Sequence, residues 1–115
     1  MYICSLIYKN LHKMSKIVKL SKEDANASGA SLKGYLHTTY HKLVELLGEP
    51  TYLPEDSGDG KVNFEWVVKF NGEIFTIYDW KTYDPEYSMY ELDRWNIGGK
   101  TYYGEFIDYI EFKLN

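Results

Sequence analysis

The sequence predicts an α+β fold: a small antiparallel sheet with a central β-hairpin and two packed helices, assembled into an oligomer. Alternating apolar residues on both sides of Asn71-Gly72 indicate the hairpin. Apolar residues at helical spacing after Thr39, and again within residues 102–114, indicate the two helices. The 115 residues are 44% hydrophobic and 17% aromatic, which suits one folded core and excludes a disordered chain. So small a sheet would leave apolar surface open, which oligomerisation could cover.

The N-terminal part is expected to differ from the rest. Residues 1–33 are predicted to form a basic arm with a short strand around Ile17, followed by a loop over residues 21–34. Residues 34–115 are predicted to form a single α+β domain. The first 22 residues carry five lysines and no acidic residue. Such a run is typical of a solvated terminus, or of a segment packed on an acidic partner subunit.

The first predicted helix has clear boundaries. Thr38 or Thr39 can cap its N-terminus, Gly48 ends it, and Pro50 prevents it from continuing. Its apolar residues recur on one face, so the helix is expected to lie against the sheet. A polar loop is expected over residues 54–61.

The hairpin gives the strongest local signal. Asn71-Gly72 favours a type I′ turn because both residues tolerate positive φ angles. Strands are predicted over residues 64–70 and 73–81. The second strand carries apolar residues on both faces and is therefore expected to be central. Its faces consist of Phe75, Ile77 and Asp79 on one side and Ile74, Thr76, Tyr78 and Trp80 on the other.

The last third of the chain has weaker patterns. Residues 82–93 are rich in tyrosine and acidic side chains and are expected to be irregular. Residues 94–97 are predicted to form a third strand, closed by Gly98-Gly99. A helix within residues 102–114 is expected to dock on the sheet.

Composition narrows the class of protein. A single cysteine, Cys4, excludes an internal disulfide framework and points to a reducing compartment. No stretch is long and apolar enough for a membrane span, and the N-terminus does not resemble a signal peptide, so a cytoplasmic location is expected. The acidic character beyond the arm argues against binding to polymeric nucleic acid. Met14 could serve as an alternative start of translation.

The histidines do not indicate a metal site or an enzyme. His37 and His41 lie four residues apart, but no Glu lies between them as in the zinc-binding HExxH motif. His37-Thr38-Thr39 matches one H-x-T element of the two-histidine phosphoesterases, which need a second copy. We therefore expect no metal, no cofactor and no catalytic residue. Asp79 is interpreted as a hydrogen-bond acceptor at a strand end rather than a catalytic acid.

Other residues favour a nucleotide-like ligand. Aromatic rings can stack on bases, while hydroxyl groups, lysines and backbone amides at glycines or at a helix start can hold phosphates. Each feature also has an ordinary structural explanation as a core residue, a turn or a helix cap. The candidate ligand-binding residues on these grounds are Thr38, Thr39, Tyr78, Trp80, Lys81, Trp95, Gly98, Gly99 and Lys100.

An ordered string of motifs over residues 34–110 gives a family resemblance. It comprises Gly34-Tyr35, Thr38-Thr39-Tyr40, Leu47-Gly48-Glu49-Pro50, Glu65-Trp66, Ile77-Tyr78-Asp79-Trp80-Lys81 and Trp95-Asn96-Ile97-Gly98-Gly99. The string resembles a widespread family of small phage proteins, the anti-CBASS cyclic-nucleotide sponges. CBASS is a bacterial defence system in which infection triggers the synthesis of a cyclic-oligonucleotide signal.

The resemblance implies a non-enzymatic immune-evasion protein in the host cytoplasm. Such a protein would be a dimer or tetramer that binds a cyclic dinucleotide, such as 3′,3′-cGAMP, and keeps it from its effector. The resemblance adds Tyr35 to the candidate ligand-binding residues. An acidic chain that captures a doubly charged ligand needs local donors, and Lys81, Arg94 or Lys100 are expected to supply them.

A second hypothesis stays open. Acidic side chains on the segment before residue 94 could imitate phosphates and make the protein an inhibitor, or DNA mimic, of a host defence enzyme. These side chains are Asp84, Glu86, Glu91 and Asp93.

Overall fold

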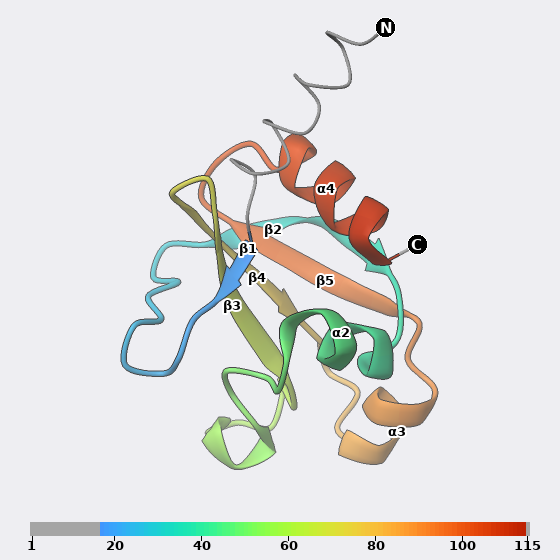
Figure 1. The fold of residues 1–115 in the computed structure, drawn as a ribbon. Helices are drawn as coiled ribbons and strands as arrows, with labels where there is room; N and C mark the ends of the chain where they lie inside the picture. The colour runs from blue at the N-terminus through green and yellow to red at the C-terminus, as the bar shows by residue number, and fades with distance from the viewer. Residues whose placement is uncertain (1–16, 115) are drawn as a thin grey trace, which may run out of the picture.

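Figure 1 shows the computed structural model of the chain, which describes residues 17–114. The strands are β1 Ile17–Lys19, β2 Ser31–His37, β3 Glu65–Phe70, β4 Glu73–Tyr78 and β5 Arg94–Gly99. Within these residues the helices are α2 Tyr40–Leu47, α3 Pro85–Tyr90 and α4 Gly104–Leu114, with a 3-10 turn, η1, at Pro54–Asp56. The strands form one antiparallel sheet in the order β1-β3-β4-β5-β2. The α+β class and the antiparallel sheet are confirmed, and the oligomeric state stays a prediction.

The central hairpin forms as the sequence predicts. Asn71 and Gly72 have φ angles of 50° and 84°, the left-handed values that a type I′ turn requires. β3 and β4 pair from Glu65↔Tyr78 to Phe70↔Glu73. β4 lies in the middle of the five strands, which explains why both of its faces carry apolar groups.

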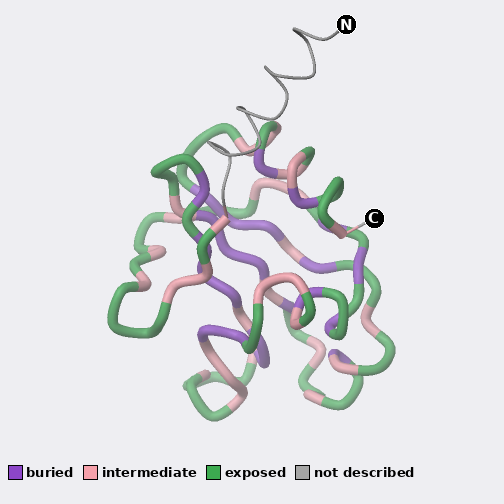
Figure 2. Tube along the Cα trace, in the orientation of Figure 1, coloured by how far each residue is buried: buried purple, intermediate pink, exposed green. Residues whose placement is uncertain are grey.

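One face of the sheet, here called the core face, is covered by α2 and α4 (Figure 1). Phe106 of α4 stacks on Phe75 of β4, with ring centroids 4.3 Å apart and ring planes 2° from parallel. Trp66 and Trp95 meet edge to face at 5.5 Å. Figure 2 shows that the buried residues follow the three middle strands. Aromatic pairs of this kind stabilise a core by about 0.5–1.5 kcal/mol beyond the area that they bury.

Helix α2 begins and ends close to the predicted residues. Thr39 has an extended backbone, and its Oγ1 accepts a hydrogen bond from the Lys42 N–H at 3.3 Å, so Thr39 is the N-cap. At the other end, the Gly48 carbonyl accepts a hydrogen bond from Trp66 Nε1 at 2.9 Å. This bond ties the end of the helix to the sheet.

Two sequence expectations are corrected. The segment expected to be a loop up to residue 34 contains the start of β2, whose pairing with β5 shifts register between Leu32 and Gly34. Such a bulge breaks the strict alternation that reveals a strand in a sequence. The segment expected to be irregular contains α3, where Asp84 Oδ1 caps the helix by accepting from the Glu86 N–H at 3.0 Å and Pro85 begins it.

The expected domain boundary also moves. Residue 33 lies inside β2, and β1 pairs with β3 through Ile17↔Phe70. β1 and the start of β2 therefore belong to the same sheet as the rest of the domain. The rest of the expected basic arm, together with Cys4 and Met14, lies outside the described residues.

A buried carboxylate organises the end of β4. Asp79 is 1% exposed. Its Oδ1 accepts from the backbone N–H groups of Asn63 and Phe64 at 2.8 and 3.0 Å. Its Oδ2 accepts from Asn63 Nδ2 at 2.9 Å and from Ser88 Oγ at 2.6 Å. One side chain thus joins the end of β4, the segment before β3, and helix α3, which supports its interpretation as a structural acceptor.

Replacing Asp79 with Ala is expected to destabilise the fold by about 3 kcal/mol or more, because several buried donors lose their acceptor at once. Urea unfolding followed by circular dichroism would measure the loss. Asp108→Ala, on the exposed side of α4, should change the stability by about 0.5 kcal/mol or less. Equal effects of the two substitutions would contradict this role of Asp79.

Candidate functional site

The face of the sheet opposite α2 and α4, here called the open face, carries a row of four side chains. The register pairs Glu65 with Tyr78, Tyr78 with Asn96, and Asn96 with Tyr35. Residues paired in this way point to the same side of a sheet, and neighbouring strands lie about 4.8 Å apart, so the row spans roughly 14 Å. Carboxylate, phenol, amide and phenol follow one another across the sheet. Polar and aromatic groups therefore alternate along the row.

The first hollow on the open face has a volume of about 490 Å³. It is lined by Leu32, Tyr35, Tyr78, Trp80, Arg94 and Asn96. Small-molecule sites in proteins commonly measure about 300–1,000 Å³. The hollow is therefore large enough for a small ligand, and most of its walls are flat aromatic rings or hydrogen-bonding groups.

Two of the exposed aromatic rings have a cation beside them. The Arg94 guanidinium lies over the Tyr35 ring, with Cζ 4.4 Å from the ring centroid. The Lys81 ammonium lies 5.6 Å from the centroid of the Trp80 ring. Tyr35 and Trp80 are 44% and 48% exposed, so both rings remain accessible. A base can stack on such a ring while the neighbouring cation holds a phosphate.

A second hollow, of about 250 Å³, lies beside the first. Its lining consists of Ala27, Ala30, Ser31, Val62, Glu65, Thr76, Tyr78, Trp80 and Gly98. Tyr78 and Trp80 line both hollows and so form the wall between them. Gly98 has no room for a side chain, because a Cβ at this position would lie 2.6 Å from Thr76 Oγ1.

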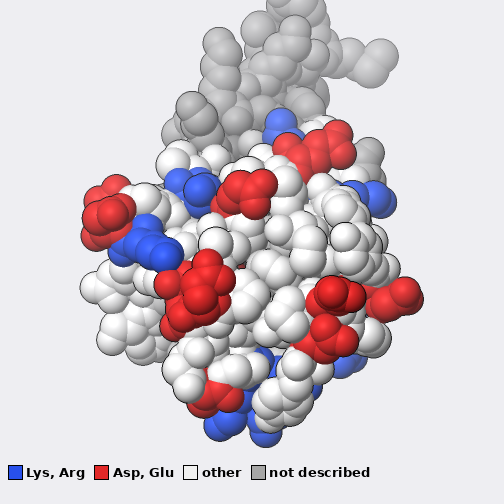
Figure 3. Space-filling model, turned by 90° about the horizontal axis from the view of Figure 1, so that it is seen from below, with Lys and Arg blue, Asp and Glu red and all other residues white. Residues whose placement is uncertain are grey.

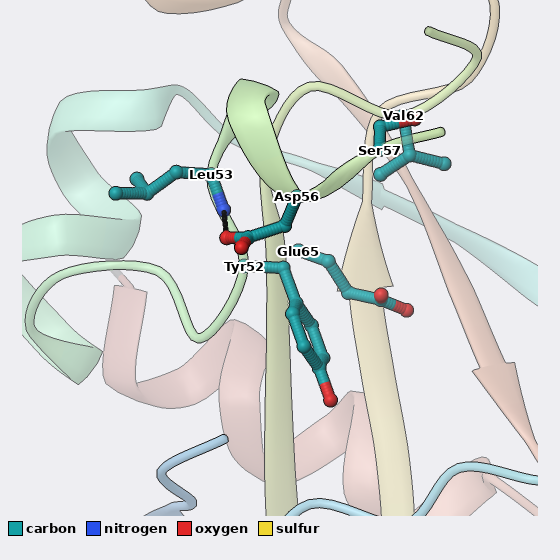
Figure 4. Close-up of a pocket in the computed structure, with 6 residues that line it drawn as sticks. All are labelled: Tyr52, Leu53, Asp56, Ser57, Val62 and Glu65. Atoms are coloured by element: carbon teal, nitrogen blue, oxygen red, sulfur yellow. Dashed lines mark hydrogen bonds between the residues drawn. The ribbon is translucent and has the colours of Figure 1, made fainter. Parts of the chain in front are cut away.

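Glu65 gives the second hollow a negative group. No hydrogen bond or ion pair holds its carboxylate within residues 17–114. Glu65 also borders a third hollow of about 260 Å³ at η1, where Figure 4 shows its carboxylate pointing away from Asp56. Asp56, by contrast, accepts from the Leu53 N–H at 2.8 Å, the dashed line in Figure 4, and pairs with Lys22 at 2.8 Å. The Glu65 carboxylate is therefore available to a ligand.

The surroundings of Glu65 act on its protonation. Partial burial, and then the nearby Asp79 carboxylate, raise the pKa of Glu65 above its ordinary value. Burial also raises the pKa of the Tyr78 hydroxyl, which a hydrogen bond with Asn96 partly offsets. Both groups are held in their neutral form over a wider pH range than in water. An unpaired, partly desolvated acid of this kind is typical of functional sites.

Half of the residues predicted for the ligand site lie together. Tyr35, Tyr78, Trp80 and Gly98 line the two hollows, and Lys81 lies beside Trp80. Their common face follows from the alternation of side chains along β2, β4 and β5.

The other half lie elsewhere. Trp95 is fully buried in the core, and a Cβ at Gly99 would meet the Phe75 ring at 2.9 Å, so both belong to the core face. Thr39 uses its hydroxyl to cap α2. Thr38 is buried at the start of α2, and Lys100 lies near Gly29. The structure therefore corrects the prediction that Trp95 could stack on a ligand.

Sequence reasoning did not select several of the lining residues, among them Glu65, Asn96 and Leu32. Glu65 and Asn96 belong to the motif string but were not selected, and Leu32 lies in the segment expected to be a loop. The alternation in β5 could have found Asn96, because Trp95 and Ile97 point into the core and the residue between them must point away. Glu65 follows from β3 in the same way.

The structure also bears on the metal-ligating groups and the acidic patch. Within residues 17–114, no group of three or more His, Cys, Asp and Glu side chains could hold a metal ion. Figure 3 shows acidic side chains in several separate groups, with Lys and Arg among them. Of the acidic patch before residue 94, Asp84 is engaged as the cap of α3. No helix of the described chain is long and apolar enough to cross a membrane.

Comparison with known proteins adds no family. No protein-family model, curated protein or solved structure matches this chain. The open face is therefore interpreted from its own geometry.

Replacing Glu65 with Gln is expected to raise the melting temperature at pH 7 by a few degrees. The folded-state pKa of Glu65 lies above its unfolded value of 4.5, so its neutral form is favoured by folding. Its contribution to stability is present below pH 4.5 and is lost as the pH rises through the raised pKa. Gln stays neutral at every pH, so the gain should shrink toward acidic pH.

Melting temperatures measured between pH 4.5 and 8 would test this prediction. Glu73→Gln, which removes the same charge from the exposed turn of the hairpin, is the matched control for the change in net charge. A gain that is identical in both variants at each pH would refute the special environment of Glu65.

Proposed function

We propose that this protein is a nucleotide sponge, which binds a cyclic dinucleotide such as 3′,3′-cGAMP on the open face of its sheet. In this proposal a phage produces the protein in the host cytoplasm, and the bound messenger cannot reach its CBASS effector. The proposal rests above all on the first hollow, where Tyr35, Tyr78 and Trp80 converge with Arg94 around about 490 Å³.

The chemistry of the hollow fits the parts of such a ligand. A cyclic dinucleotide has two bases and two phosphates, and the open face offers two exposed rings that each have a cation beside them. Stacking on aromatic side chains contributes about 1–3 kcal/mol per base. Arg94 can hold a phosphate with two parallel hydrogen bonds while its plane stays stacked on Tyr35. These local donors offset the acidic character of the domain as a whole.

Sequestration needs binding and no chemical step. A sponge withholds its ligand by mass action, so it must bind more tightly than the effector and exceed the messenger in concentration. None of the groups that line the first hollow is then required to act as a nucleophile or a base. A homodimer or tetramer, as the family resemblance implies, would multiply the number of sites per particle.

Trp80→Ala and Tyr35→Ala are each expected to weaken cyclic dinucleotide binding by about tenfold or more, because each removes one stacking surface. Tyr102→Ala is the matched control: Tyr102 is 82% exposed but lies outside the two hollows, so its loss should not change binding. The protein would be incubated with a panel of nucleotides and separated from free ligand. It would then be heat-denatured, and mass spectrometry would identify what it releases.

Three outcomes of this experiment would overturn the proposal. Release of a cleaved nucleotide would indicate an enzyme. Absence of any bound nucleotide, together with co-purification of a host protein, would favour the acidic inhibitor. Equal losses in Tyr102→Ala and Trp80→Ala would show that the open face is not the binding site.

A further inference from the structure

The two hollows of the open face differ in their hydrogen-bonding chemistry. The first contains Arg94 and Asn96, of which Arg94 only donates and Asn96 can both donate and accept. The second contains the unpaired carboxylate of Glu65, which in its ionised form only accepts. Tyr78 and Trp80 separate the two. A ligand that lies across this wall therefore meets a cation at one end and an anion at the other.

The carboxylate restricts what can occupy the second hollow. A phosphate is excluded, because it would place like charges together in a partly desolvated site. A group with two adjacent N–H donors is favoured, because a carboxylate can accept two parallel hydrogen bonds. The ligand's phosphates are thus directed toward Arg94 and Lys81, and one of its bases toward Glu65.

Among the common bases, guanine has the matching edge. Its Watson–Crick edge presents the N1–H and the exocyclic amine side by side, both as donors. Adenine presents an acceptor at N1 beside its amine, so that one of its two groups would face a carboxylate oxygen with a lone pair. Small side chains, namely Ala27, Ala30, Ser31 and Gly98, leave room for a flat ring beside the aromatic wall.

We propose that the second hollow is a guanine subsite, in which the Glu65 carboxylate accepts two hydrogen bonds from the guanine edge while the ring lies against Tyr78 and Trp80. This inference rests on the proposed function and names one base of the ligand. The second base of the dinucleotide occupies the first hollow, on the Tyr35 side of the wall.

The test is a base-swap experiment by titration calorimetry at pH 8 with cyclic di-GMP, cyclic di-AMP and cyclic di-IMP. The wild-type protein should bind cyclic di-GMP about tenfold or more tightly than cyclic di-AMP, because a good bidentate pair discriminates by this order. Cyclic di-IMP, whose base keeps the N1–H but lacks the amine, should bind with intermediate affinity.

Glu65→Gln should reverse this order. The Gln side chain offers one acceptor and one donor, so it matches the amine and N1 of adenine but cannot accept from both the N1–H and the exocyclic amine of guanine. We expect a loss of about tenfold for cyclic di-GMP and a gain for cyclic di-AMP. Glu73→Gln, the exposed control, should leave the ratio of the two affinities unchanged, and thermal melting would confirm that both variants are folded.

The outcomes separate this inference from the proposed function. If the wild-type protein binds none of the three ligands and does not bind 3′,3′-cGAMP either, both the sponge and its guanine subsite are overturned. If it binds them but Glu65→Gln leaves the ratio of affinities unchanged, or weakens all three equally, the sponge stands and the guanine subsite is overturned. A reversed ratio supports both.

Discussion

The buried Asp79 carboxylate holds together three segments that are distant in the sequence, through five hydrogen bonds that it accepts. Two donors are backbone N–H groups just before β3, one is the Asn63 amide, and two are the hydroxyls of Thr82 and of Ser88 in α3. A buried charge without enough donors would cost several kcal/mol, so the surrounding chain must adopt the conformation that supplies them. Asp79 points to the core face, and its two neighbours, Tyr78 and Trp80, consequently point to the open face. A single buried acceptor thus fixes the orientation of the wall between the two hollows.

The two faces of the strands separate the residues that pack the core from the residues that line the hollows. Along β5, Trp95 and Ile97 fill the core, whereas Arg94 and Asn96 line the first hollow. Along β3, Trp66 packs in the core, whereas its neighbours Glu65 and Val67 lie on the opposite face, where Glu65 is partly buried and Val67 is fully buried. Because neighbouring residues serve different faces, a substitution on the open face leaves the aromatic packing beneath it intact. Glu65 differs from the other residues of the open face, because the burial of its carboxylate opposes folding at neutral pH. The same carboxylate has no partner among the described residues and is available to a ligand.

Local patterns predicted most of the fold, and pairing between distant strands explains what they missed. The hairpin turn, the Thr39 cap and the helix within residues 102–114 depend on neighbouring residues and were all visible in the sequence. β2 was missed because its bulge disrupts the alternation, and only pairing with β5 defines it. The site was predicted in part for the same reason. The residue types indicated which aromatic residues and glycines could contact a ligand. The burial of Trp95 and the exposure of Tyr35, however, depend on which face of the sheet the helices cover.

The row Glu65–Tyr78–Asn96–Tyr35 takes one residue from each of four strands, and β2 comes from a part of the chain far from β3 and β4. No single hairpin contains the row, so it exists only when the whole sheet is assembled. A ligand that bridges these strands would act as a cross-link between them. One of the pairs that it would bridge is β2 with β5, which are far apart in the sequence. Because the row forms only in the assembled sheet, ligand binding would stabilise the entire domain. Ligand at 100 times its dissociation constant would add about 2.7 kcal/mol to the free energy of unfolding. Ligand bound to the open face would thus raise the stability of the whole folded domain.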